Sequence, residues 1–267
     1  MKRCKVCGGT GIIYDREILV GSVGELRICD CVDKKCDCGA VEPFQVFDKD
    51  GTHSWCSCRG ARLRLTETKK TFRNSQIPSK YKWKFIEDFD KVEPIETSNK
   101  IMGFVDTIRY KNIDEKWTKG FYLWGPAGSG KTLLASIFLQ ELMLKYSKPG
   151  RFIDLSRQFF QRLKRSYDNA DELYGTGGRI LEDLINVPFL VIDDFGVQRN
   201  TEWESEMLYN LIDSRYSEER VTIITSNENI SSYKKVAMGR VYSRILEMCM
   251  IIHVDLPDYR ESLSQQI

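Results

Sequence analysis

The chain has 267 residues, of which 42% are hydrophobic and 29% are charged, and its formal net charge is +2. This length accommodates one α/β domain with a small appendage, and the composition is typical of a folded chain rather than a disordered one. The sequence contains no apolar run of about 18 residues and no apolar stretch near its start. We therefore expect a cytoplasmic protein without a membrane-spanning helix, a secretory signal or a membrane partner.

The charges are unevenly spread. Residues 1–58 carry eight basic and nine acidic side chains, residues 59–84 carry nine basic and one acidic, and residues 85–267 carry 23 basic and 28 acidic. A basic block of this kind is typical of a solvated linker, and nucleic-acid contact is the alternative. We expect a cysteine-rich domain over 1–58, a basic linker or helix over 59–84, and a larger domain over 85–267.

Eight of the nine cysteines lie in the first 58 residues, in close pairs. Thiols stay reduced in the cytosol, so these pairs indicate zinc sites rather than disulfides. The segments between the pairs alternate like β-hairpins, the second with a turn at 49–51. The alternatives are redox-active thiols, an exchange of cysteine partners between the two sites, and His53 in place of one cysteine ligand. We expect a double zinc ribbon with two structural zinc ions per chain, one held by Cys4, Cys7, Cys29 and Cys31 and the other by Cys36, Cys38, Cys56 and Cys58.

Residues 121–132, FYLWGPAGSGKT, form an apolar strand followed by a complete G-x-x-x-x-G-K-T loop and a helical pattern. The backbone amides of such a loop bind phosphate, Lys131 neutralises phosphate charge, and Thr132 offers a hydroxyl to Mg²⁺. The sequence therefore predicts an ATP site. It comprises Gly125, Pro126, Ala127, Gly128, Ser129, Gly130, Lys131, Thr132 and Leu133.

Further buried strands are predicted over 151–155, 187–194, 221–227 and 250–254, with helical patterns between them. This alternation predicts a doubly wound α/β sheet with its ligand site at the carboxyl ends of the strands. Asp193 is placed to hold Mg²⁺, Asp194 to polarise the attacking water, and Asn227 to orient that water. Helix capping is the alternative role for the two aspartates. Only about a dozen residues follow the last strand, so we expect no helical lid.

The ordered segments GPAGSGKT, VIDDFG, TIITSN, GRVYSRILEMC and DYR resemble the DnaC/DnaI/IstB group of AAA+ ATPases over residues 74–262. This resemblance implies an AAA+ P-loop fold and a homo-oligomeric ring or spiral. It implies that Asn227 is the sensor-1 residue, that Arg244 is a finger completing a neighbour's site, and that Arg260 is the sensor-2 residue. A surface ion pair is the alternative for each arginine. DnaI-like loaders carry an amino-terminal zinc domain that engages the helicase, and the eight cysteines depart from the simpler site of that group.

Two segments are candidates for binding single-stranded DNA. The first is the basic helix predicted over 156–168, with Arg157, Arg162, Lys164 and Arg165. A solvated helix face is its alternative. The second is the basic stretch 59–84, which includes Phe72, Tyr81 and Trp83.

These patterns together predict an ATPase that loads a replicative hexameric DNA helicase and uses ATP, Mg²⁺ and Zn²⁺. An IstB-like ATPase assisting a transposase and a nucleotide-gated adaptor are the alternatives.

Overall fold

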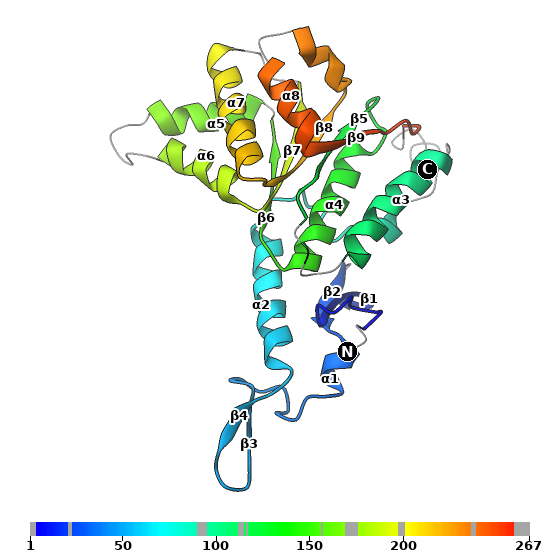
Figure 1. Cartoon of the computed structure of the whole chain (residues 1–267), viewed down its shortest axis with the longest axis vertical. Coiled ribbons are helices and arrows are strands. Elements are labelled where there is room, and N and C mark those ends of the chain that lie inside the picture. Colours follow the sequence, from blue (N-terminus) through cyan, green and yellow to red (C-terminus); the bar gives the residue numbers. More distant parts are fainter. Residues whose placement is uncertain are drawn as a thin grey trace.

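The structure is a computed structural model that describes residues 4–20, 23–89, 95–111, 115, 117–155, 157–168, 176–196, 201–235 and 239–258. An α/β body lies at one end of the molecule, and the cysteine-rich region lies at the other (Figure 1). The helix α2 (Arg59–Asn74) runs between them.

The body is built on a five-stranded sheet in which every pair of neighbouring strands is parallel. Its three central strands are almost wholly buried, which accounts for their continuous apolar sequences, and the two edge strands are partly exposed. The strand order places β8 between β5 and β7, so polar residues at the carboxyl ends of these three strands lie close together. In spatial order the strands are β6 (Gly150–Asp154), β7 (Phe189–Phe195), β8 (Val221–Ser226), β5 (Gly120–Trp124) and β9 (Cys249–His253).

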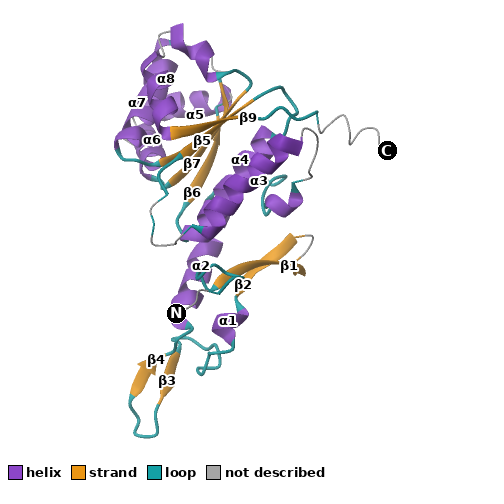
Figure 2. Cartoon of the chain, turned by 45° about the vertical axis from the view of Figure 1, so that its right-hand side comes forward, coloured by secondary structure: helices purple, strands orange, loops and turns teal. Residues whose placement is uncertain are grey.

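Helices cover both faces of the sheet, as crossover connections between parallel strands require (Figure 2). One face carries α3 (Ile95–Tyr110) and α4 (Lys131–Tyr146). The other face carries α5 (Arg157–Asp168), α6 (Thr176–Asn186), α7 (Glu202–Ser217) and α8 (Gly239–Met248). Short 3-10 helices lie at Ile86–Asp88 and Ile230–Lys235.

The predicted doubly wound α/β sheet is confirmed by this arrangement. Among the described residues, no helix follows β9, and none of the helices is long and apolar enough to cross a membrane.

Two antiparallel hairpins form the cysteine-rich region, as the sequence pattern predicted. The first consists of β1 (Ile12–Val20) and β2 (Val23–Ile28), and the short helix α1 (Asp30–Asp33) follows it. The second consists of β3 (Gln45–Phe47) and β4 (His53–Trp55). Its turn contains Gly51 with φ +79°, a conformation that favours glycine.

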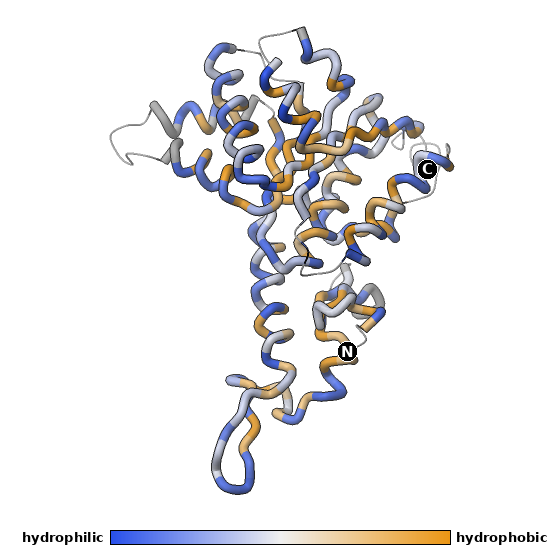
Figure 3. Tube along the Cα trace, viewed as in Figure 1, coloured by the Kyte–Doolittle hydropathy of each residue, from blue (hydrophilic) through white to orange (hydrophobic). Residues whose placement is uncertain are grey.

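The helix α2 is more than a solvated linker, because one of its faces is buried. Phe72 is fully buried in the same hydrophobic core as Leu26 of β2 and Phe138 of α4. The rings of Trp83 and Phe72 stack on each other. The prediction of DNA contact is therefore wrong for Phe72, which is fully buried, whereas Tyr81 and Trp83 pack against the same core and are partly exposed. Figure 3 shows hydrophobic segments along the sheet and a mixture of hydrophilic and hydrophobic residues along α2.

A fully buried arginine anchors the start of β8. The guanidinium of Arg215 donates to the carbonyl oxygens of Leu184, Val187 and Val221, each at 2.7 Å. These bonds join the end of α6 to the start of β8, whose other end lies at the candidate site. They also satisfy the N–H donors of the buried guanidinium, whose charge would otherwise be disfavoured by burial.

Candidate functional site

The loop between β5 and α4 has glycine where the backbone of Val254 and the side chain of Asp258 approach it closely. A Cβ atom on Gly125 would lie 2.3 Å from the carbonyl oxygen of Val254, and one on Gly128 would lie 2.0 Å from the carboxyl carbon of Asp258. The segment that leaves β9 therefore presses against the loop from outside. Gly128 and Gly130 also have φ of +80° and +87°, which other residues rarely adopt.

Lys131 and Ser129 give this loop the donors that a phosphate requires. The ammonium of Lys131 folds back over the loop and donates to the carbonyl oxygens of Gly125 at 2.9 Å and Pro126 at 2.6 Å. The hydroxyl of Ser129 is buried and has no hydrogen-bond partner among the described residues. A buried hydroxyl, a buried ammonium and the amides at the start of α4 fit the β- and γ-phosphates of a nucleotide.

Thr132 and Asp193 come together although they are 61 positions apart in the chain. The hydroxyl of Thr132 donates to Oδ1 of Asp193 at 3.1 Å. Burial raises the pKa of Asp193 to about 6, and the charge of Asp194 adds to this rise. A hydroxyl beside a buried carboxylate is the oxygen pair that holds Mg²⁺ in P-loop ATPases, so these two residues fit the ion.

Thr225 is a functional residue that the sequence analysis did not single out. Its hydroxyl donates to Oδ1 of Asp193 at 2.5 Å and accepts from the backbone N–H of Asp194 at 3.0 Å. Thr225 thus positions both acidic residues from the neighbouring strand. The available signal was a threonine near the end of the apolar strand VTIITS.

Asp194 leaves the regular strand geometry. Its φ is +58°, which is unusual for a residue with a side chain, and the pairing of β7 with β8 shifts between Ile192 and Phe195. Because of this irregularity, the backbone at Asp194 does not follow the regular alternation of the strand. Asn227, predicted to orient water, lies exposed immediately after β8.

Arg244 lies on α8 against α7. It forms an ion pair with Asp213, and its guanidinium carbon lies 5.2 Å from the ring centre of Tyr209 and 5.7 Å from that of Tyr216. In this single chain Arg244 is therefore held by its own α7.

The other predicted arginines are only partly described. Lys164 and Arg165 are exposed on α5. Arg260 and the side chains of Arg157 and Arg162 lie outside the described residues.

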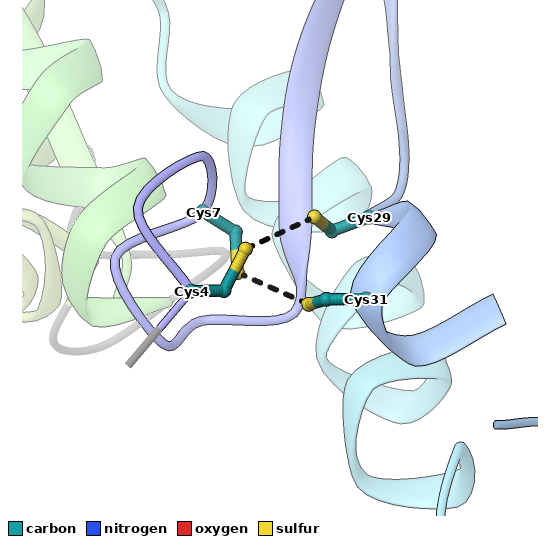
Figure 4. A group of neighbouring side chains, drawn as sticks. All are labelled: Cys4, Cys7, Cys29 and Cys31. Carbon is teal, nitrogen blue, oxygen red and sulfur yellow. Dashed lines mark hydrogen bonds between the residues drawn. The ribbon is translucent and has the colours of Figure 1, made fainter. Parts of the chain in front are cut away.

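The first group of four thiols joins the amino-terminal turn to the end of β2 (Figure 4). The sulfur atoms of Cys4 and Cys29 are 3.9 Å apart, and those of Cys7 and Cys31 are 3.7 Å apart. A tetrahedron with zinc–sulfur bonds of 2.3 Å has edges of about 3.8 Å. The four thiols therefore fit a zinc ion.

The second group consists of Cys36, Cys38, Cys56 and Cys58. The sulfur of Cys58 lies 3.5 Å from those of Cys36 and Cys38, again close to a tetrahedral edge. His53 is exposed on β4 and belongs to neither group of thiols among the described residues.

Backbone N–H groups favour the thiolate form of one cysteine in each cluster. Those of Cys7 and Val6 lower the pKa of Cys4 to about 7, and those of Cys58 and Asp37 lower the pKa of Cys56 to about 6. Burial instead raises the pKa of Cys31 and that of Cys58. Thiolates are the zinc-binding form of cysteine, so Cys4 and Cys56 are the thiols that the local backbone prepares for metal.

Comparison with known proteins bears on the body of the chain. Residues 63–266 match the family described as IstB-like ATP binding protein. Over 126 residues the chain is 32% identical to the replicative helicase loader DnaC of Escherichia coli K12, covering 47% of this chain and 49% of that protein. It is 27% identical over 155 residues to the replicative helicase loader DnaI of Bacillus subtilis 168, covering 51% and 46%. The chain thus spans about half the length of the curated relatives it matches.

A solved structure supports the same relationship. The crystal structure of the DnaC helicase loader matches with a TM-score of 0.56 and 26% identity, over 66% of this chain and 99% of that one. The expected AAA+ fold and the resemblance to DnaC and DnaI are thereby confirmed.

Proposed function

Because this chain belongs to the family of IstB-like ATP-binding proteins, we propose that it is a cytoplasmic AAA+ ATPase that loads a replicative hexameric DNA helicase. Its reaction is the hydrolysis of ATP to ADP and phosphate. The observation that carries the proposal is the convergence of Thr132, Asp193 and Thr225 beside a complete phosphate-binding loop. The likeness to two helicase loaders supports the choice of partner.

Residues 125–133 bind the triphosphate in this proposal. Lys131 neutralises the β- and γ-phosphates, and Thr132 and Asp193 hold Mg²⁺, which when bound offsets further phosphate charge. Asp194 accepts a hydrogen bond from the attacking water, and Asn227 orients that water. Thr225 keeps the two acidic residues in place.

The ATPase acts as a ring or spiral of identical subunits. Arg244 completes the site of a neighbouring subunit, and Arg260 binds nucleotide at the sensor-2 position. Single-stranded DNA contacts α5, whose sequence includes Arg157, Arg162, Lys164 and Arg165.

The cysteine-rich region, residues 1–58, contacts the helicase, with residues 59–84 joining it to the ATPase domain at 85–267. Each group of four thiols holds one zinc ion. Because all four ligands in each group come from the protein, the ions are structural and stabilise two small hairpins that have little core of their own.

The second candidate is an IstB-like ATPase that assists a transposase on duplex DNA, and the match to the IstB-like family is compatible with it. Two measurements distinguish the helicase loader from the transposase helper. The first is ATP hydrolysis in the presence of single-stranded or duplex DNA, and the second is capture of the purified replicative helicase or transposase from the same organism. A helicase loader should be stimulated by single-stranded DNA and should capture the helicase. A preference for duplex and for the transposase would support the second candidate, and a chain that binds ATP without hydrolysing it would be a nucleotide-gated adaptor.

Two variants test the active site within the same assay. Lys131→Ala should lose ATP binding, because the phosphates lose their principal positive partner. Asp194→Asn should bind ATP and hydrolyse it slowly, because only the interaction with water is lost. Normal hydrolysis by Asp194→Asn would mean that another residue positions the water.

A further inference from the structure

The second hairpin presents one face that lies largely exposed among the described residues. Its paired residues are Gln45 with Trp55 and Phe47 with His53. Because alternate residues of a strand point to the same side, these four side chains share one face. Val46 points to the opposite side and packs on the hydrophobic cluster around the second group of thiols.

Three of the four side chains on this face are aromatic and exposed, and the fourth, Gln45, is half-buried. Phe47 is 69% exposed and Trp55 is 57% exposed, and the rings of Phe47 and His53 lie 6.1 Å apart. The guanidinium of Arg59 lies 4.1 Å from the centre of the Trp55 ring. Large exposed side chains gathered on one face of a small hairpin serve binding rather than folding.

A positive stripe begins at this face and follows α2 toward the ATPase body. Arg59, Lys70 and Arg73 are separated by 11 and three residues, a spacing that puts them on one side of a helix. The stripe spans about 21 Å at 1.5 Å per residue. The carbonyl of the helix's last residue, Asn74, accepts a hydrogen bond from Arg151, so the same end of α2 meets a further cation of the body.

By the same helical spacing Arg62 and Lys69, which precede Arg73 by eleven and four residues, lie on its side of α2, but both are engaged in ion pairs. Arg62 pairs with Asp33 at 2.7 Å, and Lys69 pairs with Glu25 at 2.6 Å. Within the described part of the chain, no carboxylate lies within ion-pair distance of Lys70, and both it and Arg73 are exposed. The stripe therefore keeps its positive charge available.

We propose that the aromatic face of the second hairpin and the stripe on α2 form one binding site for single-stranded DNA. Bases stack on Phe47, His53 and Trp55, and phosphates lie along Arg59, Lys70 and Arg73. Base stacking on aromatic rings beside a positive track is the general means of binding single strands without reading sequence. This site goes beyond the proposed function, because it binds DNA without bound ATP and without assembly into a ring. It rests on the proposed function only in the choice of DNA rather than RNA as the ligand.

The dimensions favour a nucleic acid over a protein. Each strand of the hairpin has three residues, so the face is about 10 Å long and two strands wide. A standard protein interface buries about 800 Å² on each partner, which this ribbon alone cannot supply. Two or three bases fit it, and stacked base faces inside a duplex are not accessible to it.

Charge at the hairpin turn gives the strand a direction. Asp48, Lys49 and Asp50 lie at the turn, beyond Phe47 and His53, and leave this tip with one net negative charge. Phosphates are repelled from this tip and attracted toward α2. The bound strand therefore runs from the aromatic face along α2 rather than across the tip.

The test measures binding of labelled oligo(dT) of about 20 nucleotides to the full chain without nucleotide, by fluorescence anisotropy. Trp55→Ala and Phe47→Ala should each weaken binding about tenfold, and Trp55→Phe should keep most of the affinity. The matched control is Tyr110→Ala, because Tyr110 is an aromatic residue that is 79% exposed on α3. Zinc content should stay unchanged in all four variants, which excludes loss of folding as the cause.

The positive stripe is tested through the salt dependence of binding. For a single strand the slope of log K against log salt is negative, and each lost phosphate contact reduces its magnitude by about 0.7. The slope of the combined Lys70→Ala and Arg73→Ala variant should therefore be less steep by about 1.4. Lys100→Ala, an exposed lysine of α3, is the control and should leave the slope unchanged.

Three results would overturn the proposal. Unchanged oligo(dT) affinity in the combined Phe47→Ala and Trp55→Ala variant would exclude the stacking site. If the same combined variant loses capture of the helicase but still binds oligo(dT), the aromatic face is a protein-docking surface. Tighter binding of oligo(U) than of oligo(dT) would exclude DNA as the ligand. If the unmodified chain fails to capture the helicase, the loader function fails while the DNA result remains readable.

Discussion

The ring of Trp83 stacks on that of Phe72, with centroids 4.8 Å apart and planes inclined by 12°. Tyr14 of the first hairpin stacks on Trp83 in turn, with centroids 5.8 Å apart. The backbone N–H of Trp83 also donates to the side chain of Gln140 at 2.6 Å. Gln140 lies on α4, the helix that begins with Lys131. The cysteine-rich hairpin, α2 and the phosphate-binding helix are therefore connected through one aromatic cluster.

Removing the Phe72 ring tests this connection. Phe72→Ala should lower the free energy of unfolding by about 3–5 kcal/mol, because a fully buried ring is lost and a cavity remains. The measurement is denaturant unfolding. Leu63→Ala, on an exposed position of the same helix, should change stability by less than about 0.5 kcal/mol. Similar effects of the two substitutions would contradict a shared core.

The two thiol clusters should differ in their effect on the ATPase body. Cys4→Ser and Cys56→Ser should each leave one zinc ion per chain by metal analysis. Only Cys4→Ser should lower the thermal midpoint of the body by several degrees, because Leu26 of the adjoining hairpin belongs to the core shared with α4. The cluster around Cys56 packs only on a small separate group that includes Phe44. Equal thermal midpoints for the two variants would refute this asymmetry.

Much of the fold could be predicted because its signals are local. The P-loop, the buried strands and the paired cysteines each depend on residues close in sequence. The roles of Thr225 and Arg215 depend instead on strand order, which brings β8 between β5 and β7 and sets α6 beside its start. A periodic pattern does not encode that order, so one threonine and one buried cation looked like ordinary strand and helix residues. The burial of Phe72 was missed for the same reason.

The buried charge of Asp193 should destabilise the protein when no nucleotide is bound. Its pKa in the folded chain is about 6, raised from 3.8. The folded state therefore binds the proton more readily, so stability rises as pH falls from about 6 to 4, and above pH 6 the buried charge costs about 3 kcal/mol. Asp193→Asn should accordingly raise the thermal midpoint at pH 7.5.

The dependence on pH provides the control for this prediction. The advantage of Asp193→Asn should disappear near pH 4, where the native carboxyl is also neutral. Added Mg²⁺ and ATP should stabilise the native chain more than the variant, because the variant lacks the carboxylate. A gain that is the same at pH 4 and pH 7.5 would point to packing rather than charge.

Thr225 should matter for hydrolysis more than for binding. Thr225→Val removes the hydroxyl that donates to Asp193 and leaves the N–H of Asp194 without its acceptor. We expect kcat to fall at least tenfold, since small misplacements of reacting groups are costly, while ATP affinity stays within a few-fold. Thr225→Ser keeps the hydroxyl and should retain most of the activity. Loss of ATP binding in Thr225→Val would instead assign the residue to the phosphate-binding loop.

Arg244 can be tested against its own ion pair. If it only stabilises α8 through Asp213, then Arg244→Ala and Asp213→Asn should lower stability alike and leave hydrolysis intact. If it completes a neighbour's site, Arg244→Ala should bind ATP normally and hydrolyse it poorly, while Asp213→Asn should retain hydrolysis. A cation supplied in trans can be worth about 10³–10⁵ in rate, because it meets charge that develops during phosphoryl transfer.

Mixing two inactive variants decides between these roles. In mixed assemblies of Arg244→Ala and Lys131→Ala, an intact phosphate-binding loop on the first subunit can meet an intact arginine on the second. Because the two defects then lie at different interfaces, some sites are complete and ATP hydrolysis should partly recover. The control mixes Lys131→Ala with Asp194→Asn, both of which damage the same pocket, so recovery should be absent. If mixed oligomers form and the first mixture also stays inactive, Arg244 does not act on a neighbour, and its contact with Asp213 is its function.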